Sequence, residues 1–190
     1  MKKTMLLVLL LVVFLQGCGA LVVGAAATSV SVIHDRRPAG TILDDKNIQF
    51  KIITLINNDA ELRQPTSVAV TSYNYAVLLT GQIETQEHKE RVINMARNTP
   101  QVKRVIDQIE IGAPTSFSQD TYDSYLTSKA KLELLDLGLE SFDPSRVKVV
   151  TNNNVVYLMG LVTQQEATAV VEKVRYIDGV KRVVKIFEYI

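Results

Sequence analysis

The single thiol of the chain, Cys18, is the residue whose type and position most directly predict chemistry. It closes residues 15–18, Leu-Gln-Gly-Cys, and it follows Lys2, Lys3 and an apolar stretch over residues 5–14. A charged start, an apolar stretch and small or permissive residues at a cleavage point indicate a secretory signal. The apolar stretch is well short of the ~20 residues that a membrane span needs. The sequence therefore favours cleavage over the alternative, an uncleaved membrane anchor with a buried structural cysteine.

A cysteine at the cleavage point resembles the signal of bacterial lipoproteins. The resemblance implies that residues 1–17 are removed as a signal peptide, that diacylglycerol is attached to the Cys18 sulfur, and that a third acyl chain (palmitate) is attached to the new amino group. In two-membrane bacteria, sorting resembles a rule in which Asp after the cysteine retains the protein at the inner membrane. Gly19 stands there instead and predicts the periplasmic face of the outer membrane. Two or more acyl chains anchor a protein stably.

Composition limits the classes of partner. Removal of residues 1–17 leaves 173 of the 190 residues, with 19 basic against 20 acidic side chains once Lys2 and Lys3 are lost. A net charge near −1 provides no basic field for nonspecific nucleic-acid binding. Once Cys18 is acylated no thiol remains for a disulfide, so packing alone must hold the domains together. The length leaves room for two small cores.

The chain after the tether contains an internal repeat, which decides the fold class. Five residues recur 79 positions later, namely Val68, Val70, Val77, Leu79 and Gly81 as Val147, Val149, Val156, Leu158 and Gly160. Residues 102–105 recur 78 positions later as 180–183. One residue is lost between these two matches, near Thr85 and Thr163. Upstream, the helix-spaced apolar residues also recur at 78: Ile48, Ile52 and Ile56 match Leu126, Ala130 and Leu134.

Each repeat is predicted to contain a helix, a two-stranded hairpin, a second helix and a last strand. Apolar residues at i, i+4 and i+8 indicate the first helix, and Asn74 or residues 152–154 provide hairpin turn chemistry. Thr85 and Thr163 are predicted N-caps of the second helix. This order predicts an α+β fold: two tandem domains, each a small three-stranded mixed sheet with two helices packed on one face.

Residues 77–81 and 156–160, together with 179–183, resemble the BON domain, a family named for bacterial osmotic-stress and nodulation proteins. Two such units behind a lipoprotein signal resemble outer-membrane lipoproteins of this family. The predicted organisation is an acylated tether and turn-rich leading loop at 18–43, a first BON domain at 44–113 and a second at 118–190. The resemblance implies phospholipid binding and a role in outer-membrane integrity under envelope stress, rather than catalysis. Gathering at the division site is expected from the resemblance alone.

Residues able to perform catalysis are scattered. His34 and His88 have no companion at metal-ligand spacing, and each is expected to be solvated. The acidic residues form no evident pair, and Gly81 and Gly160 form no phosphate-binding glycine run. We therefore predict no enzyme activity, no metal and no cofactor.

Repeat 2 differs from repeat 1 on one face of its first helix. On a helical wheel at 100° per residue, one face carries Leu126, Ala130, Leu134 and Leu137, and another carries Tyr122, Tyr125, Lys129 and Leu132. Repeat 1 has Asp44, Asn47, Lys51 and Thr54 in place of the second group. Tyrosine suits a membrane interface, and lysine can meet a phosphate. We predict that Tyr122, Tyr125, Lys129 and Leu132 bind anionic phospholipid, with packing against repeat 1 as the alternative.

The first helix of repeat 1 carries Phe50, Ile53 and Leu55 beyond its core stripe. These residues could receive repeat 2 or could themselves meet lipid. Two functions remain open from the sequence. One is a lipid-binding module beside its own anchor, and the other is a periplasmic scaffold that binds proteins of envelope assembly or of the division machinery.

Overall fold

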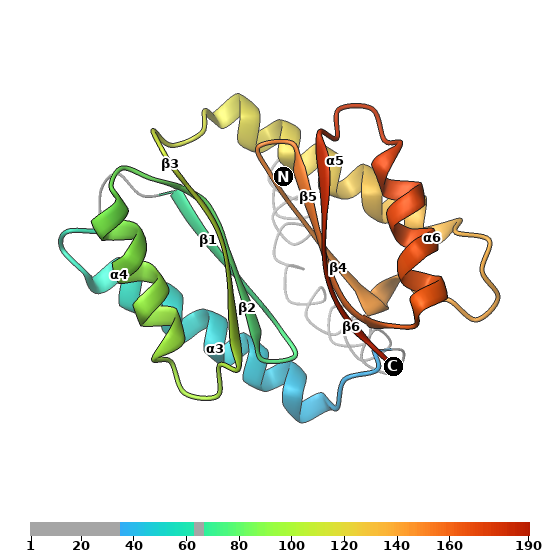
Figure 1. Cartoon of the computed structure of the whole chain (residues 1–190), viewed down its shortest axis with the longest axis horizontal. Coiled ribbons are helices and arrows are strands. Elements are labelled where there is room, and N and C mark those ends of the chain that lie inside the picture. Colours follow the sequence, from blue (N-terminus) through green and yellow to red (C-terminus); the bar gives the residue numbers. More distant parts are fainter. Residues whose placement is uncertain (1–34, 63–66) are drawn as a thin grey trace, which may run out of the picture. The chain divides into compact units, whose positions relative to one another are not determined.

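The computed structural model describes residues 35–62 and 67–190 (Figure 1). The predicted signal peptide, Cys18 and the tether as far as residue 34 lie outside the described residues. Residues 36–190 form one compact unit, which contains both predicted repeats.

Repeat 1 has two helices and three strands within the described residues, in the predicted order (Figure 1). They are α3 (Ala39–Asn58), β1 (Ser67–Tyr73), β2 (Ala76–Ile83), α4 (Gln86–Arg97) and β3 (Arg104–Ile111). The sheet order is β1-β2-β3, with β1 antiparallel and β3 parallel to β2. The predicted three-stranded mixed sheet is confirmed.

Repeat 2 has the same topology. Its elements are α5 (Phe117–Leu135), a short 3-10 helix (Pro144–Arg146), β4 (Val147–Asn152), β5 (Val155–Val162), α6 (Gln164–Arg175) and β6 (Arg182–Tyr189). β5 is the central strand, antiparallel to β4 and parallel to β6. The α+β fold class with two tandem repeats is confirmed.

The hairpin turns have the predicted chemistry. In repeat 1, φ is 50° at Asn74 and 65° at Tyr75, and the same values recur at Asn153 and Asn154 in repeat 2. Two successive positive φ angles match the type I′ turn, whose twist suits a two-residue hairpin. Asparagine tolerates this left-handed region better than most residues do.

The predicted caps of the second helices are also confirmed. The Thr85 hydroxyl accepts a hydrogen bond from the His88 N–H, and Thr163 forms a reciprocal capping box with Glu166. Both helices end three or four residues before Pro100 and Gly179. The sequence predicts that these two residues end the helices, but they lie in the loops that follow.

The first helix begins earlier than the sequence predicts. The sequence predicts a turn-rich loop up to residue 43 and the first domain from residue 44, but α3 begins at Ala39, directly after its N-cap Pro38. The φ of Pro38, −56°, already suits a helix start. The buried Asp45 and Thr41 extend the core stripe of α3 by two turns toward the amino end. Tertiary packing thus overrides the local turn signals of Pro38 and Gly40.

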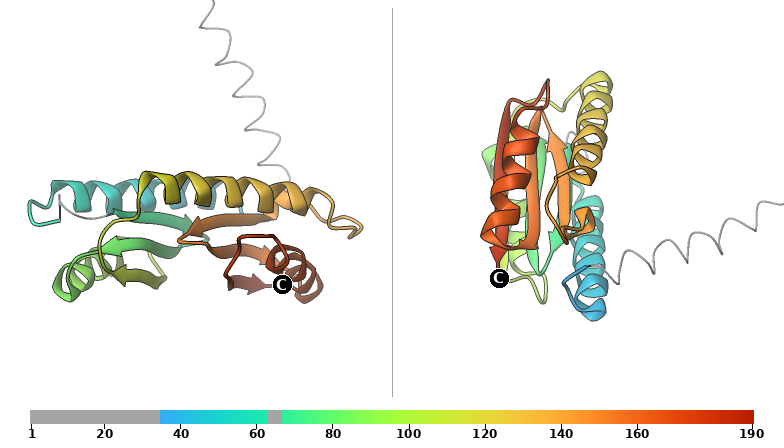
Figure 2. Two further views of the ribbon diagram at one scale, coloured as in Figure 1. Left: turned by 90° about the horizontal axis from the view of Figure 1, so that it is seen from above. Right: turned by 90° about the vertical axis from the view of Figure 1, so that its right-hand side faces the viewer.

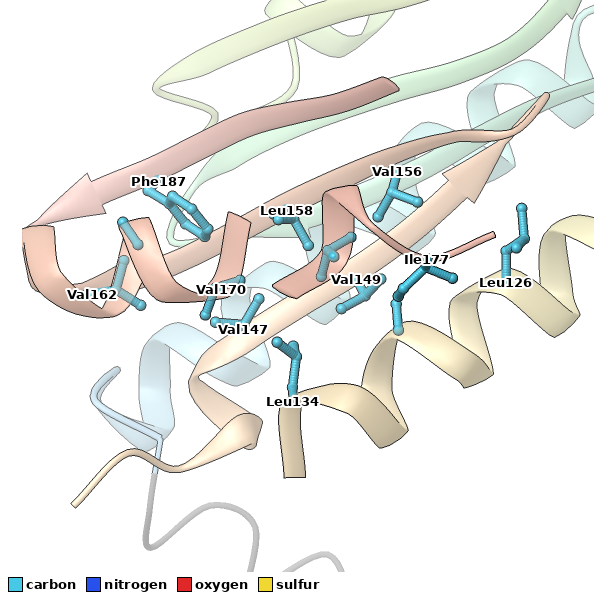
Figure 3. Packing of buried hydrophobic residues seen from close by; sticks show 13 residues of the cluster. Leu126, Leu134, Val147, Val149, Val156, Leu158, Val162, Val170, Ile177 and Phe187 are labelled. Carbon is cyan, nitrogen blue, oxygen red and sulfur yellow. The ribbon is translucent and has the colours of Figure 1, made fainter. Parts of the chain in front are cut away.

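Each repeat has its own core between its two helices and one face of its sheet. In repeat 1, the stripe Ile48, Ile52 and Ile56 packs on sheet residues such as Val77 and Leu79. Figure 3 shows the equivalent cluster of repeat 2, where α5 directs Leu126 and Leu134 toward the sheet. The predicted core stripes are confirmed, and Leu137, which lies just beyond α5, packs against the second cluster.

The opposite faces of the two sheets are buried as well, because they pack against each other. This inter-sheet cluster consists of Tyr73, Ala76, Leu78, Val155, Tyr157, Met159 and Ile186. The Tyr73 hydroxyl adds polar contacts across it, donating to the Arg146 carbonyl at 3.1 Å and accepting from the Leu161 N–H at 3.3 Å. The repeats therefore contact each other through their sheets. The contact leaves two helix faces exposed. We call them the Tyr125 face of α5, which carries Tyr122, Tyr125 and Leu132, and the Phe50 face of α3, which carries Phe50 and Leu55.

Candidate functional site

The rotation of α5 is fixed by its buried residues. Leu126 and Ala130 are fully buried, and Asp123 at the same side of the helix accepts hydrogen bonds from the N–H groups of Asn153 (2.7 Å) and Asn154 (2.9 Å). Apolar packing and this carboxylate together hold one face of α5 against the sheet and its hairpin turn. The remaining face of the helix must point away from the core.

Three of the four residues predicted to bind lipid are exposed on that remaining face. Tyr125 is 54% exposed and Leu132 is 66% exposed, while Tyr122 is less open. The rings of Tyr122 and Tyr125 lie 5.9 Å apart, tilted by 30°. Lys129 is half-buried. The structure thus places two paired aromatic rings and a leucine on the solvent side of one helix.

Tyr122 also contacts the loop after α6. Gly179 has a φ of +96°, and a Cβ atom there would collide with the Tyr122 hydroxyl. The glycine therefore allows the ring to lie close to this loop, which explains the lower exposure of Tyr122 compared with Tyr125. Its place in the pair is set by repeat 2 itself.

Lys129 lines a shallow recess between α5 and α6, with a volume of about 630 Å³. The recess also contains the Lys173–Glu133 ion pair (3.2 Å) and the exposed ring of Tyr176. Arg175 lies over that ring at 5.0 Å. The lining carries two lysines against the carboxylates of Glu133, Glu172 and Asp178, and Arg175 is paired with Glu172. An anionic headgroup would therefore be met here by the Lys129 ammonium beside the exposed Tyr176 ring, and not by a net positive charge of the recess.

Sequence reasoning missed two residues of this surface. Tyr176 caps the end of α6, and Leu135, 69% exposed, ends α5. Each is a large apolar side chain beside charged residues at a helix end. That sequence pattern could have identified both residues. The recess that joins Tyr176 to Lys129 depends on the packing of two helices more than 40 positions apart in the chain, and no local pattern predicts it.

The equivalent helix face of repeat 1 is polar at the matching positions. The Asp44 carboxylate accepts a hydrogen bond from the Tyr75 hydroxyl at 3.0 Å, and the other three positions are Asn47, Lys51 and Thr54. Next to them, Phe50 is 72% exposed and borders a groove of about 350 Å³ with Leu55 and the loop at residues 98–100.

The histidines and acidic residues are the side chains that could take part in catalysis or metal binding. His88 is half-buried on α4, and its Nδ1 atom has no hydrogen-bond partner, which differs from the solvated side chain that was expected; His34 lies outside the described residues. Within residues 35–62 and 67–190, no three His, Cys, Asp or Glu side chains are grouped so that they could hold a metal ion. No helix in this part of the chain is both long and apolar enough to cross a membrane.

The BON domain family matches the chain twice, over residues 44–113 and 122–190. The chain belongs to the BON domain family. The predicted resemblance is therefore confirmed, and both matches coincide with the two structural repeats. The second match begins at the tyrosine pair of α5, so the candidate site lies within a BON domain.

Three curated relatives are similar to this chain over most of its length and of their own. Outer membrane lipoprotein DolP of Haemophilus influenzae is 35% identical over 179 residues, 94% of this chain and 91% of that protein. A 21 kDa hemolysin of Actinobacillus pleuropneumoniae is 31% identical over 82% of this chain and 79% of its own length. Osmotically-inducible protein Y of Escherichia coli is 28% identical over 96% of this chain and 92% of its own length. This BON protein is thus similar to DolP along nearly its whole length.

Proposed function

We propose that this BON protein is a lipoprotein of the outer membrane that binds anionic phospholipid through its second BON domain and supports outer-membrane integrity. Two independent lines support the anchor: the signal ending at Cys18, and the similarity to a relative whose name is outer membrane lipoprotein. Cys18 is then the acylated residue. Mass spectrometry of the mature amino terminus tests this directly, and a cleaved chain with an unmodified Cys18 would contradict it.

The exposure of the Tyr125 face carries the proposal for the lipid site. The contact between the repeats uses the sheets, so Tyr125 and Leu132 remain available on α5. An exposed tyrosine that keeps its hydroxyl in water while its ring enters a less polar layer is suited to the headgroup region. Lys129 adds a positive charge for a phosphate on the same helix face.

The expected binding free energies favour a lipid site that acts together with the acyl anchor. Burying one such side chain fully contributes about 1.5–3 kcal/mol, and each lysine near an anionic surface contributes about 1 kcal/mol. These contributions alone give weak binding from free solution. Attachment through acyl chains raises the effective concentration of the site at the membrane, so weak contacts suffice to orient the domain there.

Vesicle sedimentation tests the proposal. The protein would be the mature chain from residue 18 with Cys18→Ser, so that no acyl chain contributes to binding. We expect it to sediment with vesicles of phosphatidylethanolamine and phosphatidylglycerol, to bind much less to vesicles lacking phosphatidylglycerol, and to dissociate as salt is raised. Equal, negligible binding to both vesicles would contradict the lipid site and favour the protein scaffold.

A further inference from the structure

The first helices of the two repeats lie on one side of the unit formed by residues 36–190. Both views in Figure 2 show α3 and α5 on the same side, with α4 and α6 at the other edges of the sheets. Each of the two helices buries one stripe against its own sheet. Both helices therefore lie along the same side of this unit, each with its unburied face away from its own core.

Helix α3 exposes large apolar side chains on its outer face. Leu43 is 65% exposed and Phe50 is 72% exposed. At 100° per residue these two residues, seven positions apart, point within about 20° of each other. They lie opposite the buried stripe that contains Ile48 and Ile52. Ordinary surface positions seldom carry two such residues on one line, because each leaves apolar area in contact with water.

Three lysines come from the first helices of the two repeats and from the first strand of repeat 2, and we call them the seam lysines: Lys46 on α3, Lys131 on α5 and Lys148 on β4. On β4, Val147 and Val149 point into the core of repeat 2, so Lys148 points to the other face of the sheet, which faces repeat 1. None of the three forms an ion pair with any residue that the structure describes.

The seam lysines are near enough to act on one another. Desolvation lowers the pKa of the Lys148 ammonium below its ordinary value, and the charges of Lys131, Lys46 and Arg37 lower it further. Arg37 is neutralised by Asp45 at 2.7 Å. Like charges drawn together without an acidic partner repel each other, and an anion placed among them would relieve that repulsion.

We propose that the seam lysines, with Leu43 and Phe50 of α3, form a second bilayer-contact site that binds the phosphate groups of anionic phospholipids. This inference rests on the proposed function, because it places the new site on the same side of the protein as α5, which carries Tyr125. The membrane surface would then contact both BON domains, and not the second alone.

Charge and chain length both favour a bilayer as the occupant. The surface combines unpaired cations with apolar side chains spread over two parallel-lying helices, which matches a flat anionic layer above an apolar one. Cys18 lies 20 residues before Pro38, and at ~3.5 Å per residue this length reaches up to ~70 Å. The anchor can therefore hold this side of the protein at the membrane without strain.

Tryptophan fluorescence separates the two sites, because the chain has no tryptophan of its own. Phe50→Trp, Tyr125→Trp and Tyr189→Trp would each be placed in the mature chain with Cys18→Ser. Tyr189 is the last residue of β6 and serves as the control, because both views in Figure 2 show the carboxyl end of the chain on the side away from α3 and α5. Added to vesicles containing phosphatidylglycerol, the first two variants should shift their emission to shorter wavelength, and Tyr189→Trp should not.

The seam lysines are tested by charge removal. Lys46→Gln with Lys131→Gln should lower vesicle affinity about fivefold per lysine and reduce its salt dependence. Lys181→Gln with Lys185→Gln removes the same charge from the exposed end and edge of repeat 2 and should have little effect. A shift at Tyr125→Trp without one at Phe50→Trp, or equal effects of the two lysine pairs, would overturn the second site and leave the proposed function standing. The absence of vesicle binding by any variant would overturn both.

Discussion

At the scale of single residues, two buried aspartates hold the first helix of each repeat to its hairpin turn. Asp45 and Asp123 are equivalent in the two repeats, and both are almost fully buried. Each accepts the N–H groups of both residues in its hairpin turn, with distances of 2.7–2.9 Å. The first helix of each repeat is therefore bonded to a turn about 30 residues later.

Replacing Asp123 by Ala should lower the free energy of unfolding by about 2–4 kcal/mol. The change removes charge-assisted hydrogen bonds and leaves the N–H groups of Asn153 and Asn154 without their acceptor. Urea unfolding followed by circular dichroism would measure it. Asp120→Ala, an exposed site one turn earlier on the same helix, should cost less than about 1 kcal/mol. Equal effects of the two changes would contradict the turn-anchor role.

At the scale of secondary-structure elements, the loop after α6 and helix α5 determine each other's positions through Gly179 and Tyr122. Gly179→Ala introduces a Cβ atom both at a positive φ and against the Tyr122 hydroxyl. We expect a loss of about 1–3 kcal/mol together with a shifted Tyr122 ring resonance in the NMR spectrum.

Gly138→Ala is the matched control for this change. Gly138 also has a positive φ, +69°, but a Cβ atom there meets nothing within 4 Å. It should therefore lose stability through backbone strain alone, and its Tyr122 resonance should stay in place. If both variants shifted the ring equally, the contact between Gly179 and Tyr122 would not position the tyrosine pair.

The elements themselves could largely be predicted from the sequence, because their signals are local. Apolar spacing located the cores of α3 and α5, and Thr85, Thr163 and the Asn turns marked helix starts and hairpins. The start of α3 was missed because Thr41 and Asp45 are held by distant partners. The burial of both sheet faces was also missed, although residues 76–79 and 155–159 are continuous runs of apolar side chains, a pattern typical of strands covered on both sides.

The candidate site was predicted less completely than the fold. A helical wheel places Tyr122, Tyr125, Lys129 and Leu132 away from the core, since that depends on periodicity alone. The same wheel cannot show that Tyr176 joins Lys129 around one recess or that Lys148 approaches Lys46. Those neighbours are brought together by tertiary packing and by the contact between the sheets.

At the scale of the whole molecule, Arg36 connects the chain that precedes repeat 1 to repeat 2. Its guanidinium donates to both carboxylate oxygens of Glu166, at 2.6 and 2.9 Å, and to the Leu161 carbonyl at 3.0 Å. Arg146 and the Thr163 N–H also donate to Glu166. Burial acts to raise the pKa of the Glu166 carboxyl, but the hydrogen bonds from Arg36, Thr163 and Arg146 and the charge of Arg36 outweigh it and lower the pKa below its ordinary value.

The lowered pKa gives stability a definite pH dependence. Because the folded-state pKa of Glu166 lies below the unfolded value of about 4.3, its contribution is present above that value and is lost as the pH falls through the folded pKa. Glu166→Gln should cost about 1.5–3 kcal/mol at pH 7, and the difference from the unmodified protein should shrink toward pH 3. Urea unfolding at both pH values would measure it. Glu172→Gln, in an exposed pair with Arg175, should show almost no difference, and a gap that widens in acid would contradict this role of Glu166.

The central claim for the molecule is that the Tyr125 face of α5 meets an anionic bilayer, and one substitution tests it most directly. Tyr125→Glu replaces a ring that is 54% exposed by a negative charge, about 100° around α5 from the buried Leu126, so the fold should be unaffected. Gln165→Glu adds the same charge on the exposed start of α6 as a control. In sedimentation with phosphatidylglycerol vesicles, Tyr125→Glu should weaken binding at least about tenfold, through lost burial and charge repulsion, while Gln165→Glu should bind like the unmodified chain. Unchanged binding by a folded Tyr125→Glu protein would contradict the account.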